Sequence, residues 1–341
     1  MKFGIIFGGQ SYEHEVSIVS AISVKRALKH DCVFVFCDKD RKFFLIEDKN
    51  MIAAYFKNGE YKKAKELQIS NGGFFVSGMF SKNRIQADVY INLIHGCDGE
   101  DGKIASMFEF FNIEYIGPRL EASVLSYNKV LTKKFAEIVG VKTLKYESIT
   151  RNSLPTFDYP LILKPARLGS SLGIGVVHSE KELEYAMDMA FELDNIALIE
   201  PFVANVKEYN LAGCKIGDEM IFSNFEEPKK VDFLNFDQKY LDFSRPDKPE
   251  IPTISEIVQE KMKENFTKIY NCGFEGALIR CDFFVIDNEV YLNEINPCPG
   301  SLANYLFDDF NDIVERLSRS LPVFREIPVS YDYITKITAN K

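Results

Sequence analysis

The stretch ALIRCDFFVIDNEVYLNEIN (277–296) decides the fold. Two apolar runs within it, rich in aromatic and β-branched residues, predict the strands of a β-hairpin. Each run carries two polar side chains that lie two residues apart, and such a pair shares one face of its strand. These residues are Arg280 and Asp282 on the first strand, and Glu294 and Asn296 on the second.

This polar face is typical of a metal site. Polar groups on one face of an apolar hairpin cost several kcal/mol unless something compensates for their burial. Carboxylate and amide oxygens are the hard ligands that Mg²⁺ prefers, and Mg²⁺ usually leaves its other positions to phosphates and water. The face therefore predicts a site for Mg²⁺ and phosphate. A buried network of ion pairs is the alternative.

The register of the hairpin tests this interpretation. Residues directly opposite each other share a face, but a two-residue turn at Asp287-Asn288 would place Asp282 and Glu294 on opposite faces. The metal site therefore requires a connection of odd length, such as one that also includes Glu289, or a β-bulge. A two-residue turn without a bulge would rule it out.

A second signal is the segment LILKPARLGSSLGIG (161–175). Lys164 ends a predicted strand, and three glycines follow it with two serines among them. Glycines allow backbone amides to approach phosphates closely, and a lysine supplies positive charge. The arrangement is no P-loop, because no G-K-[ST] follows and no helix begins there. Together with the hairpin, it predicts a phosphate-binding loop.

Two further motifs are less specific by themselves. IEPFV (199–203) is an apolar strand with one carboxylate, which is compatible with an adenine-binding edge or with plain core; Glu208 beyond it would reach ribose hydroxyls. HGCDGEDG (95–102) follows a predicted strand and is either a solvated turn or the acidic lining of a cleft. His95 is equally compatible with a structural and a functional role.

The first strand ends in GGQSYEHEVS (8–17). Its glycines suggest a phosphate loop, but their spacing is not that of G-x-G-x-x-G, and Glu13 and Glu15 would repel phosphate. The residues by themselves argue against a phosphate here and leave the ligand of this loop open. Glu15 fits the first turn of a helix, where a carboxylate is favourable near the positive end of the helix dipole.

Strands that alternate with helices up to residue 118 predict an α/β fold with a mostly parallel sheet, whose site lies at the carboxyl ends of its strands. Segment 49–86 is polar and poorly patterned, with a possible helix over 59–67. A single helix is expected over 121–139. From residue 206 the pattern predicts antiparallel strands.

Composition excludes several classes of function. The chain of 341 residues carries 41 basic and 50 acidic residues, a net charge of −9, which argues against non-specific binding to nucleic acid or to anionic membranes. A basic cleft for an anionic ligand remains possible in an acidic molecule. Seven cysteines without a C-x-x-C pair, no signal peptide and no membrane span predict a cytoplasmic protein with reduced thiols.

Taken together, these motifs resemble the ATP-grasp superfamily, and within it the D-alanine–D-alanine ligase family. The resemblance runs in order through almost the whole chain, and the combination is far more specific than any single motif. The matching stretches are GGQSYEHEVS (8–17), HGCDGEDG (95–102), SYNK (126–129), KPARLGSS (164–171), IEPF (199–202), FDQKYLDF (236–243), IRCDFFV (279–285) and NEINPCPGS (293–301).

The resemblance implies an ATP-grasp fold preceded by an N-terminal Rossmann-like parallel-sheet domain. The expected parts are the Rossmann-like substrate domain 1–118, a central ATP-grasp subdomain 119–204 with the phosphate loop and adenine strand, and a C-terminal subdomain 205–341 with a lid loop at 226–249 and the metal hairpin. The lid agrees with the segment's own composition, which mixes charge, aromatic residues and three prolines without a helical period.

The implied reaction joins two D-alanines at the expense of ATP, for peptidoglycan synthesis. A D-alanine carboxylate attacks the γ-phosphate to form an acyl phosphate, and the amine of a second D-alanine displaces phosphate. Two Mg²⁺ ions, for which Mn²⁺ is an expected substitute, bridge the phosphates and neutralise developing charge. The family is homodimeric, and its implied partners are these small molecules, not nucleic acid or membrane.

Each matching position receives a role from the resemblance. The implied ATP-binding residues are Lys129, Lys164, Glu200, Phe202, Val203, Glu208, Lys239 and Phe284. The implied metal ligands are Asp282, Glu294 and Asn296. The implied catalytic residues are Glu13, Ser170, Tyr240, Arg280 and Gly300. The implied substrate-binding residues are Glu13, His95, Arg280, Gly300, Tyr305 and Leu306.

Some of these roles are specific. Arg280 and the amide of Gly300 would form an oxyanion hole, while Glu13 would bind the first ammonium and join Ser170 and Tyr240 in a triad that ties the lid to the site. Tyr240 resembles the D-alanine-selective type of lid. One position departs from the family: many relatives have a serine at the second-substrate site where this chain has Tyr305.

Three alternatives follow. An ATP-grasp ligase for another carboxylate and amine is disfavoured by the combination of Glu13, Ser170 and Tyr240. A non-catalytic ATP-binding regulator would not need Arg280. A dinucleotide-dependent dehydrogenase is disfavoured because G-x-G-x-x-G is absent.

Overall fold

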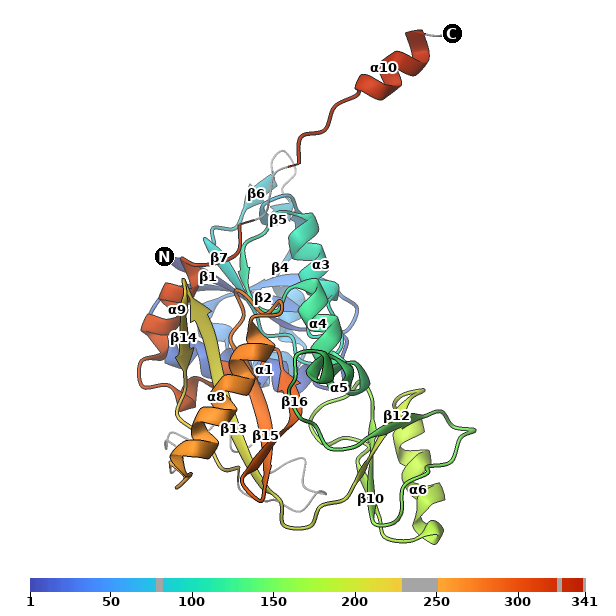
Figure 1. The fold of residues 1–341 in the computed structure, drawn as a ribbon. Helices are drawn as coiled ribbons and strands as arrows, with labels where there is room; N and C mark the ends of the chain where they lie inside the picture. Colours follow the sequence, from blue (N-terminus) through green and yellow to red (C-terminus); the bar gives the residue numbers. More distant parts are fainter. Residues whose placement is uncertain (78–81, 229–250, 324–326, 340–341) are drawn as a thin grey trace.

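The computed structural model describes residues 1–77, 82–228, 251–323 and 327–339, and it contains three β-sheets with helices packed on them (Figure 1). None of the described helices combines the length and the apolar character that crossing a membrane requires. The lysine and tyrosine expected on the lid, Lys239 and Tyr240, lie outside the described residues, as does most of the lid loop 226–249.

The N-terminal sheet has eight strands in the order β6-β5-β4-β3-β2-β1-β7-β8. The parallel group β2-β1-β7-β8 has the predicted α/β arrangement, because consecutive strands are joined through helices. Its carboxyl ends carry the loops at 8–17 and 95–102. The strands are β1 Lys2–Gly8, β2 Asp31–Cys37, β3 Phe43–Ile46, β4 Lys65–Ser70, β5 Gly73–Ser77, β6 Lys82–Arg84, β7 Val89–Asn92 and β8 Tyr115–Ile116.

Segment 49–86 corrects one expectation. The helix expected over 59–67 is wrong: only a 3-10 turn spans Glu60–Lys63, and β4, β5 and β6 continue the sheet as an antiparallel meander. Strands β4 (KELQIS) and β6 (KNR) are mostly polar, and the apolar run of β5 (GFFVS) is only three residues long, which explains the missed strands. The helices and 3-10 turns of this part are α1 His14–Ala27, η1 Asp48–Asn50, α2 Ala53–Lys57, η2 Glu60–Lys63 and α3 Lys103–Phe110.

The single helix expected over 121–139 is also wrong, because the chain breaks into two helices at Asn128. The Asn128 side chain accepts from the amides of Val130 and Leu131 and so caps the second helix. This break places Lys129 in the first turn of that helix. The central elements are α4 Leu120–Tyr127, α5 Lys129–Ile138, β9 Glu147–Ile149, β10 Leu161–Pro165, β11 Gly175–Val177, α6 Glu180–Phe191 and β12 Ala197–Pro201.

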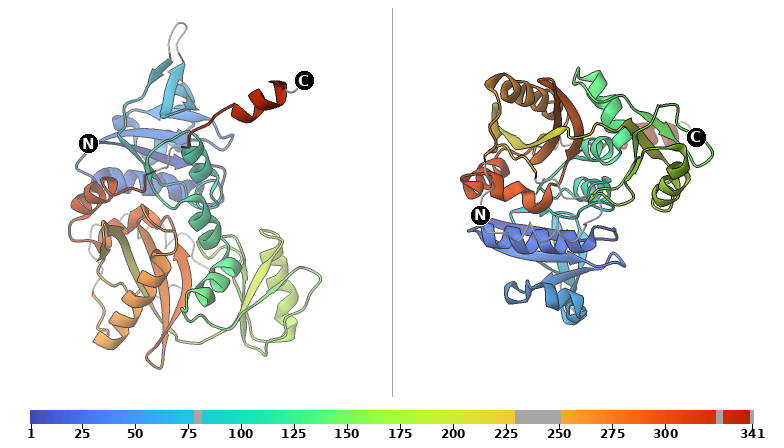
Figure 2. Two further views of the ribbon diagram at one scale, coloured as in Figure 1. Left: turned by 45° about the horizontal axis from the view of Figure 1, so that its top comes forward. Right: turned by 90° about the horizontal axis from the view of Figure 1, so that it is seen from below.

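The strands after residue 206 are antiparallel, as predicted, in the order β14-β13-β15-β16. Helix α8 packs against this sheet, with Val258, Met262 and Phe266 buried. The remaining elements are β13 Lys207–Ile216, β14 Glu219–Phe222, α8 Glu256–Tyr270, β15 Ile279–Ile286, β16 Glu289–Asn296, η3 Gly300–Leu306, α9 Phe310–Ser318 and α10 Asp332–Ala339. Figure 2 shows that α10 stands away from the body of the molecule.

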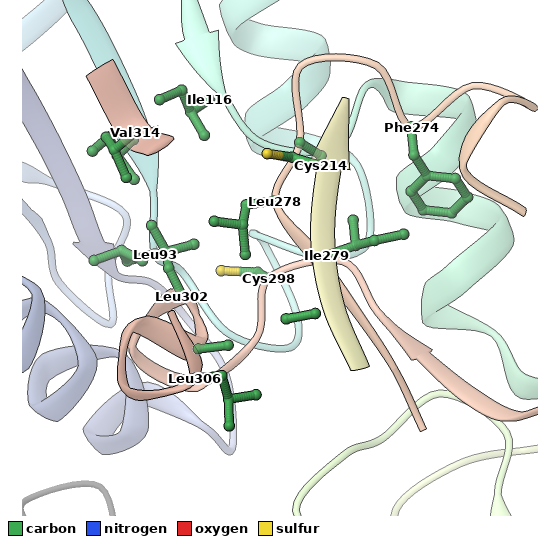
Figure 3. Close-up of a cluster of buried hydrophobic side chains, with 14 of the residues drawn as sticks. Leu93, Ile116, Cys214, Phe274, Leu278, Ile279, Cys298, Leu302, Leu306 and Val314 are labelled. Carbon is green, nitrogen blue, oxygen red and sulfur yellow. The ribbon is translucent and has the colours of Figure 1, made fainter. Parts of the chain in front are cut away.

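One hydrophobic cluster joins the N-terminal and C-terminal sheets. Leu93, which follows β7, lies in it with Leu278 and Cys298 from the hairpin region and Leu302 and Leu306 from η3 (Figure 3). All of these side chains are buried. This shared core fixes the polar face of the hairpin relative to the loops of the N-terminal sheet.

Candidate active site

The hairpin contains the β-bulge that a metal site on its polar face requires. Its turn has two residues, Asp287 and Asn288, both with positive φ as a type I′ turn requires. A β-bulge between Asp282 and Phe283 then shifts the pairing by one residue. Asp282 therefore lies opposite Glu294, and the carboxylates share a face as the metal hypothesis demands.

On this face Arg280 and Asp282 form a two-bond ion pair. Arg280 donates from Nε to Oδ1 at 2.7 Å and from Nη2 to Oδ2 at 2.8 Å, and Asn296 Nδ2 donates to the same Oδ2 at 3.0 Å. Asp282 is buried. A guanidinium has five N–H donors, so this pairing uses only two of them.

Three carboxylates lie around this face, and they belong to Glu208, Asp282 and Glu294. Arg280 compensates only part of their negative charge. Burial raises the pKa of Asp282 to about 6 although Arg280 opposes the change. Burial, then the charges of Asp282 and Glu294, raise the pKa of Glu208 to about 7. Glu208 lies opposite Phe284 on the neighbouring strand. A bound cation would relieve this repulsion, so the donor set fits a divalent metal.

A buried group of two lysines and one glutamate lies beside this face. Lys164 Nζ is 2.7 Å from Glu200 Oε2 and 3.4 Å from the Oδ1 of Asn293, the bulge residue, while Lys133 bonds the other oxygen of Glu200. Burial disfavours the Glu200 carboxylate, but the ammonium groups of Lys164 and Lys133 outweigh it and lower its pKa to about 2. Two cations against one anion leave net positive charge, which suits a phosphate.

Two findings here differ from the sequence interpretation. The Glu200 carboxylate is buried against the two lysines, which the sequence did not indicate, while Phe202 and Val203, which are partly exposed, continue beyond the strand. Lys133 was missed, since a lysine four residues after Lys129 on a helix is ordinarily a surface residue. Its only sequence signal is the i, i+4 spacing, which places it on the same face as Lys129.

This cluster yields a stability prediction. Lys133→Met should lower the free energy of unfolding by about 3 kcal/mol, because it removes one of two cations from a buried carboxylate while Lys164 still neutralises it in part. Denaturant unfolding measures the change. Lys134→Met is the matched control, since Lys134 is exposed on the same helix. Equal losses in the two variants would contradict the buried pair.

The glycine-rich loop reaches the first-strand loop. Ser170 has positive φ and donates its hydroxyl hydrogen to Oε1 of Glu13, which lies 157 residues earlier in the chain. A Cβ at Gly169 would lie 2.9 Å from that oxygen, and one at Gly96 would lie 2.5 Å from Glu13 Oε2. A side chain at either glycine would therefore displace the Glu13 carboxylate from this position.

The surroundings of the Glu13 carboxylate suit a positively charged ligand. Its side chain is buried, and its Oε2 has no hydrogen-bond partner among the described residues. Burial, followed by the charge of Glu100, raises the pKa of Glu13. A buried carboxylate with an unpartnered oxygen is costly unless a donor arrives, and an ammonium group supplies one.

His95 lies in the same acidic region. Its Nε2 is 2.8 Å from Ser20 Oγ on α1, and its Nδ1 is 3.5 Å from Glu100 Oε1. Lys129 approaches from the other side: its ammonium bonds the carbonyl of Leu168 and lies 3.9 Å from Glu294. Beside this region, a cavity of about 530 Å³ opens, lined among others by Tyr12, Tyr127, Arg167 and Leu168.

The chain after the hairpin is strained. In η3, Ser301, Leu302 and Ala303 have φ of 52°, 52° and 49°, left-handed conformations that cost non-glycine residues on the order of 1–3 kcal/mol each. Such strain persists only where the surroundings hold it, and functional loops are typical places. Gly300 opens this turn, so its amide is held by the same packing.

The predicted second-substrate residues have different surroundings. The Tyr305 hydroxyl donates to Glu226 Oε2 at 3.2 Å, and Asn210 Nδ2 donates to the same oxygen at 2.9 Å. The Leu306 side chain lies in the hydrophobic cluster (Figure 3), while its carbonyl accepts from the Asn224 amide at 3.0 Å. Tyr305 therefore presents a polar group beside the hairpin face, whereas the Leu306 side chain does not.

Comparison with known proteins agrees with this geometry. Residues 2–118 match the family model described as D-ala D-ala ligase N-terminus, and residues 129–310 match the one described as D-ala D-ala ligase C-terminus. The D-alanine–D-alanine ligase of Campylobacter concisus is 59% identical over 100% of this chain and 99% of its own length. That of Campylobacter lari is 54% identical over the same shares.

Solved structures show the same relation. The D-alanine–D-alanine ligase of Helicobacter pylori has a TM-score of 0.85 and 49% identity, and the alignment covers 95% of this chain and 100% of that one. The VanG D-Ala:D-Ser ligase of Enterococcus faecalis, at 24% identity, has a TM-score of 0.74 over 93% and 99% of the two chains, and shows the fold alone. The chain has the ATP-grasp fold and belongs to the D-alanine–D-alanine ligase family.

Proposed function

We propose that this chain joins two D-alanines to D-alanyl-D-alanine with cleavage of ATP to ADP and phosphate, as a step of peptidoglycan precursor synthesis. The observation that carries the proposal is the contact between Ser170 and Glu13. It joins the loop suited to phosphates to the carboxylate suited to an amino-acid ammonium, so both substrates would meet in one cleft. The names of the relatives and the matched family models support the same reaction.

In the first step we propose that Glu13 binds the ammonium of the first D-alanine, with His95 beside it. Lys129 and Lys164 hold the phosphates of ATP, Glu208 the ribose, and the carboxylate oxygen of D-alanine attacks the γ-phosphorus as ADP leaves. Phe202, Val203 and Phe284 would frame the adenine. Glu200 acts through the lysines, because its carboxylate holds Lys164 in place.

The metal ligands in this proposal are Asp282, Glu294 and Asn296. Two Mg²⁺ ions, replaceable by Mn²⁺, would supply charge neutralisation for the transferred phosphoryl group. The excess of carboxylates over cations on the hairpin face, where Asp282 is buried and Glu208 and Glu294 are partly exposed, supports a divalent metal. It does not by itself select magnesium.

In the second step the amine of the other D-alanine attacks the acyl carbon, and phosphate leaves. Arg280 and the Gly300 amide stabilise the negative oxygen that forms on that carbon. Tyr305 and Leu306 belong to the proposed second-substrate site, where the Tyr305 hydroxyl replaces the serine of many relatives. Lys239 and Tyr240, outside the described residues, keep their proposed roles on the lid.

The proposal includes the organisation of the protein. We divide the chain into a substrate domain 1–118, a central ATP-grasp subdomain 119–204 and a C-terminal subdomain 205–341, each of which contains one of the three sheets. We further propose a homodimer that works in the cytoplasm. All seven cysteines are free thiols, which suits a reducing compartment.

Phosphate release tests the proposed function. The protein is supplied with ATP and Mg²⁺ and a panel of D- and L-amino acids, and product dipeptides are identified by mass. We expect release that depends strictly on D-alanine and yields D-alanyl-D-alanine. Equal activity with another amino acid pair would replace the substrate assignment, and ATP binding without release on any member of the panel would favour a regulator.

A further inference from the structure

Helix α1 carries a row of serines that the proposed reaction does not use. Ser17, Ser20 and Ser23 recur every third residue in SIVSAIS (17–23), so they lie along one side of the helix. Each one bonds residues outside the helix. Ser17 accepts from the Gly8 amide at 2.7 Å and donates to the Leu93 carbonyl at 2.6 Å.

Ser20 and Ser23 connect the helix to the strained turn η3. Ser20 Oγ accepts from the Ser301 amide at 3.1 Å, and Ser23 Oγ accepts from Asn304 Nδ2 at 3.4 Å. Both contacts join residues about 280 positions apart in the chain. The Ser301 amide directly follows Gly300, whose own amide is the proposed oxyanion donor. Ser20 thus anchors the backbone next to that donor.

The second partner of Ser20 is the His95 ring. Ser20 Oγ lies 2.8 Å from His95 Nε2, and both side chains are buried. A hydroxyl has one hydrogen to donate. Since Ser20 already accepts from Ser301, its hydrogen is satisfied within the described contacts only if it donates to Nε2. Nε2 is then the acceptor, and the proton of the neutral ring sits on Nδ1.

This tautomer directs a donor into the amino-acid end of the cleft. Nδ1 faces Glu100 at 3.5 Å, and both Glu100 and His95 act electrostatically on Glu13. The Cys298 thiol lies with His95 and Glu100 in one group, within 4.8 Å between ligand atoms. The ring therefore presents an N–H toward the acidic region where the first D-alanine would bind.

We propose that Ser20 is a positioning residue that fixes His95 in the Nδ1–H tautomer and holds the η3 turn, so that one hydroxyl aligns the first-substrate site with the oxyanion donor. The catalytic consequence rests on the proposed function, whereas the tautomer does not. A shift of reacting groups by about 1 Å is enough to cost on the order of 10² in rate, so a single anchor between the two sites is significant.

The tautomer is tested first, in protein without substrates. Two-bond ¹H–¹⁵N correlation spectra of the imidazole rings separate Nδ1–H, Nε2–H and doubly protonated histidine. The chain has only four histidines, so His95→Gln assigns the signal. At mildly alkaline pH we expect Nδ1–H for His95 in the wild type. We expect a shift toward Nε2–H in Ser20→Ala, because the donor to Nε2 is gone. A wild-type ring protonated on Nε2 would overturn the proposal.

Kinetics then tests the positioning role. Ser20→Ala should lower kcat about tenfold or more and raise KM for the first D-alanine, with KM for ATP changed by less than about twofold. Ser20→Thr, which keeps a hydroxyl, should recover both the tautomer and part of the rate. Ser17→Ala is the matched control: Ser17 is equally buried on the same helix, but its partners are backbone groups.

The control separates positioning from loss of stability. Ser17→Ala should lower the melting temperature while kcat and both KM values stay within about twofold. Equal kinetic effects in Ser17→Ala and Ser20→Ala would reduce Ser20 to a structural residue and overturn the proposal. If the wild type shows the Nδ1–H tautomer but forms no D-alanyl-D-alanine, the proposed function fails and the tautomer assignment stands.

Discussion

Arg280→Ala is expected to reduce turnover by a factor on the order of 10² or more while ATP still binds. The proposed role of Arg280 is to stabilise negative charge that develops only during attack on the acyl phosphate, so its loss affects kcat more than nucleotide affinity. The Arg280 side chain is only 15% exposed and its position is fixed by two bonds to Asp282. The donors are therefore oriented before the reaction begins. Steady-state phosphate release and calorimetric binding of ATP with Mg²⁺ measure the two effects separately.

Removal of Arg280 also leaves Asp282 without its cation, which calls for a control that removes an arginine from another carboxylate. Arg41 makes a two-bond contact with the buried carboxylate of Asp98, with distances of 3.0 and 2.9 Å, although the Arg41 side chain is 51% exposed. Arg41→Ala should therefore lower stability but keep turnover within about twofold. Near-normal turnover of Arg280→Ala, or an equal fall in both variants, would contradict the oxyanion role.

Chelation of divalent metal is expected to abolish phosphate release, and added Mg²⁺ or Mn²⁺ should restore it. The metal would be worth several kcal/mol of transition-state stabilisation, and each 1.4 kcal/mol corresponds to about a tenfold change in rate. Phosphate release in the presence of a chelator measures the effect. Thermal melting with ATP gives a second measurement, because ATP should stabilise the protein more strongly when the metal is present. Persistent release in the chelator would remove the hairpin metal site.

Single variants on β16 assign the metal to the hairpin face. Glu294→Gln should raise the Mg²⁺ concentration needed for half-maximal activity and lower turnover at least 10²-fold, because it removes a proposed anionic ligand. Glu289→Gln is the matched control on the same strand, where Glu289 pairs with Lys142 and Lys261 at the turn. Its activity should stay within about twofold. Equal sensitivity to Mg²⁺ in both variants would place the metal elsewhere.

Much of the fold follows from local patterns in the sequence. The parallel strands around β1, the antiparallel strands after residue 206 and the hairpin at 277–296 are long apolar runs with clear turn signals, and each is present as predicted. The sequence-based predictions of strands and helices were wrong where the apolar pattern was weak or interrupted. Strands β4 and β6 are short and mostly polar, and β5 has an apolar run of only three residues. The break at Asn128 depends on a side-chain cap within an otherwise continuous helical pattern.

The candidate site was predictable in its parts but not in its connections. Sequence alone required a bulge or an odd turn in the hairpin, and the structure contains the bulge. The pairing of Glu200 with Lys133 and Lys164 was not predictable, because it joins a helix to two strands. The bonds of Ser20 to Ser301 and His95 were missed for the same reason.

The sequence by itself determined the α/β class, the glycine-rich loop after Lys164 and the polar face of the hairpin. These depend on residue periodicity, turn chemistry and the alternation of side chains along a strand, all of which act over a few residues. Only the tertiary structure decided which carboxylates compensate which cations. The contact of Glu13 with Ser170 across 157 residues, which the family resemblance implied, is present in it. Burial and charge pairing between distant segments depend on how the sheets pack, and the shared core around Leu93, Cys298 and Leu302 fixes that packing.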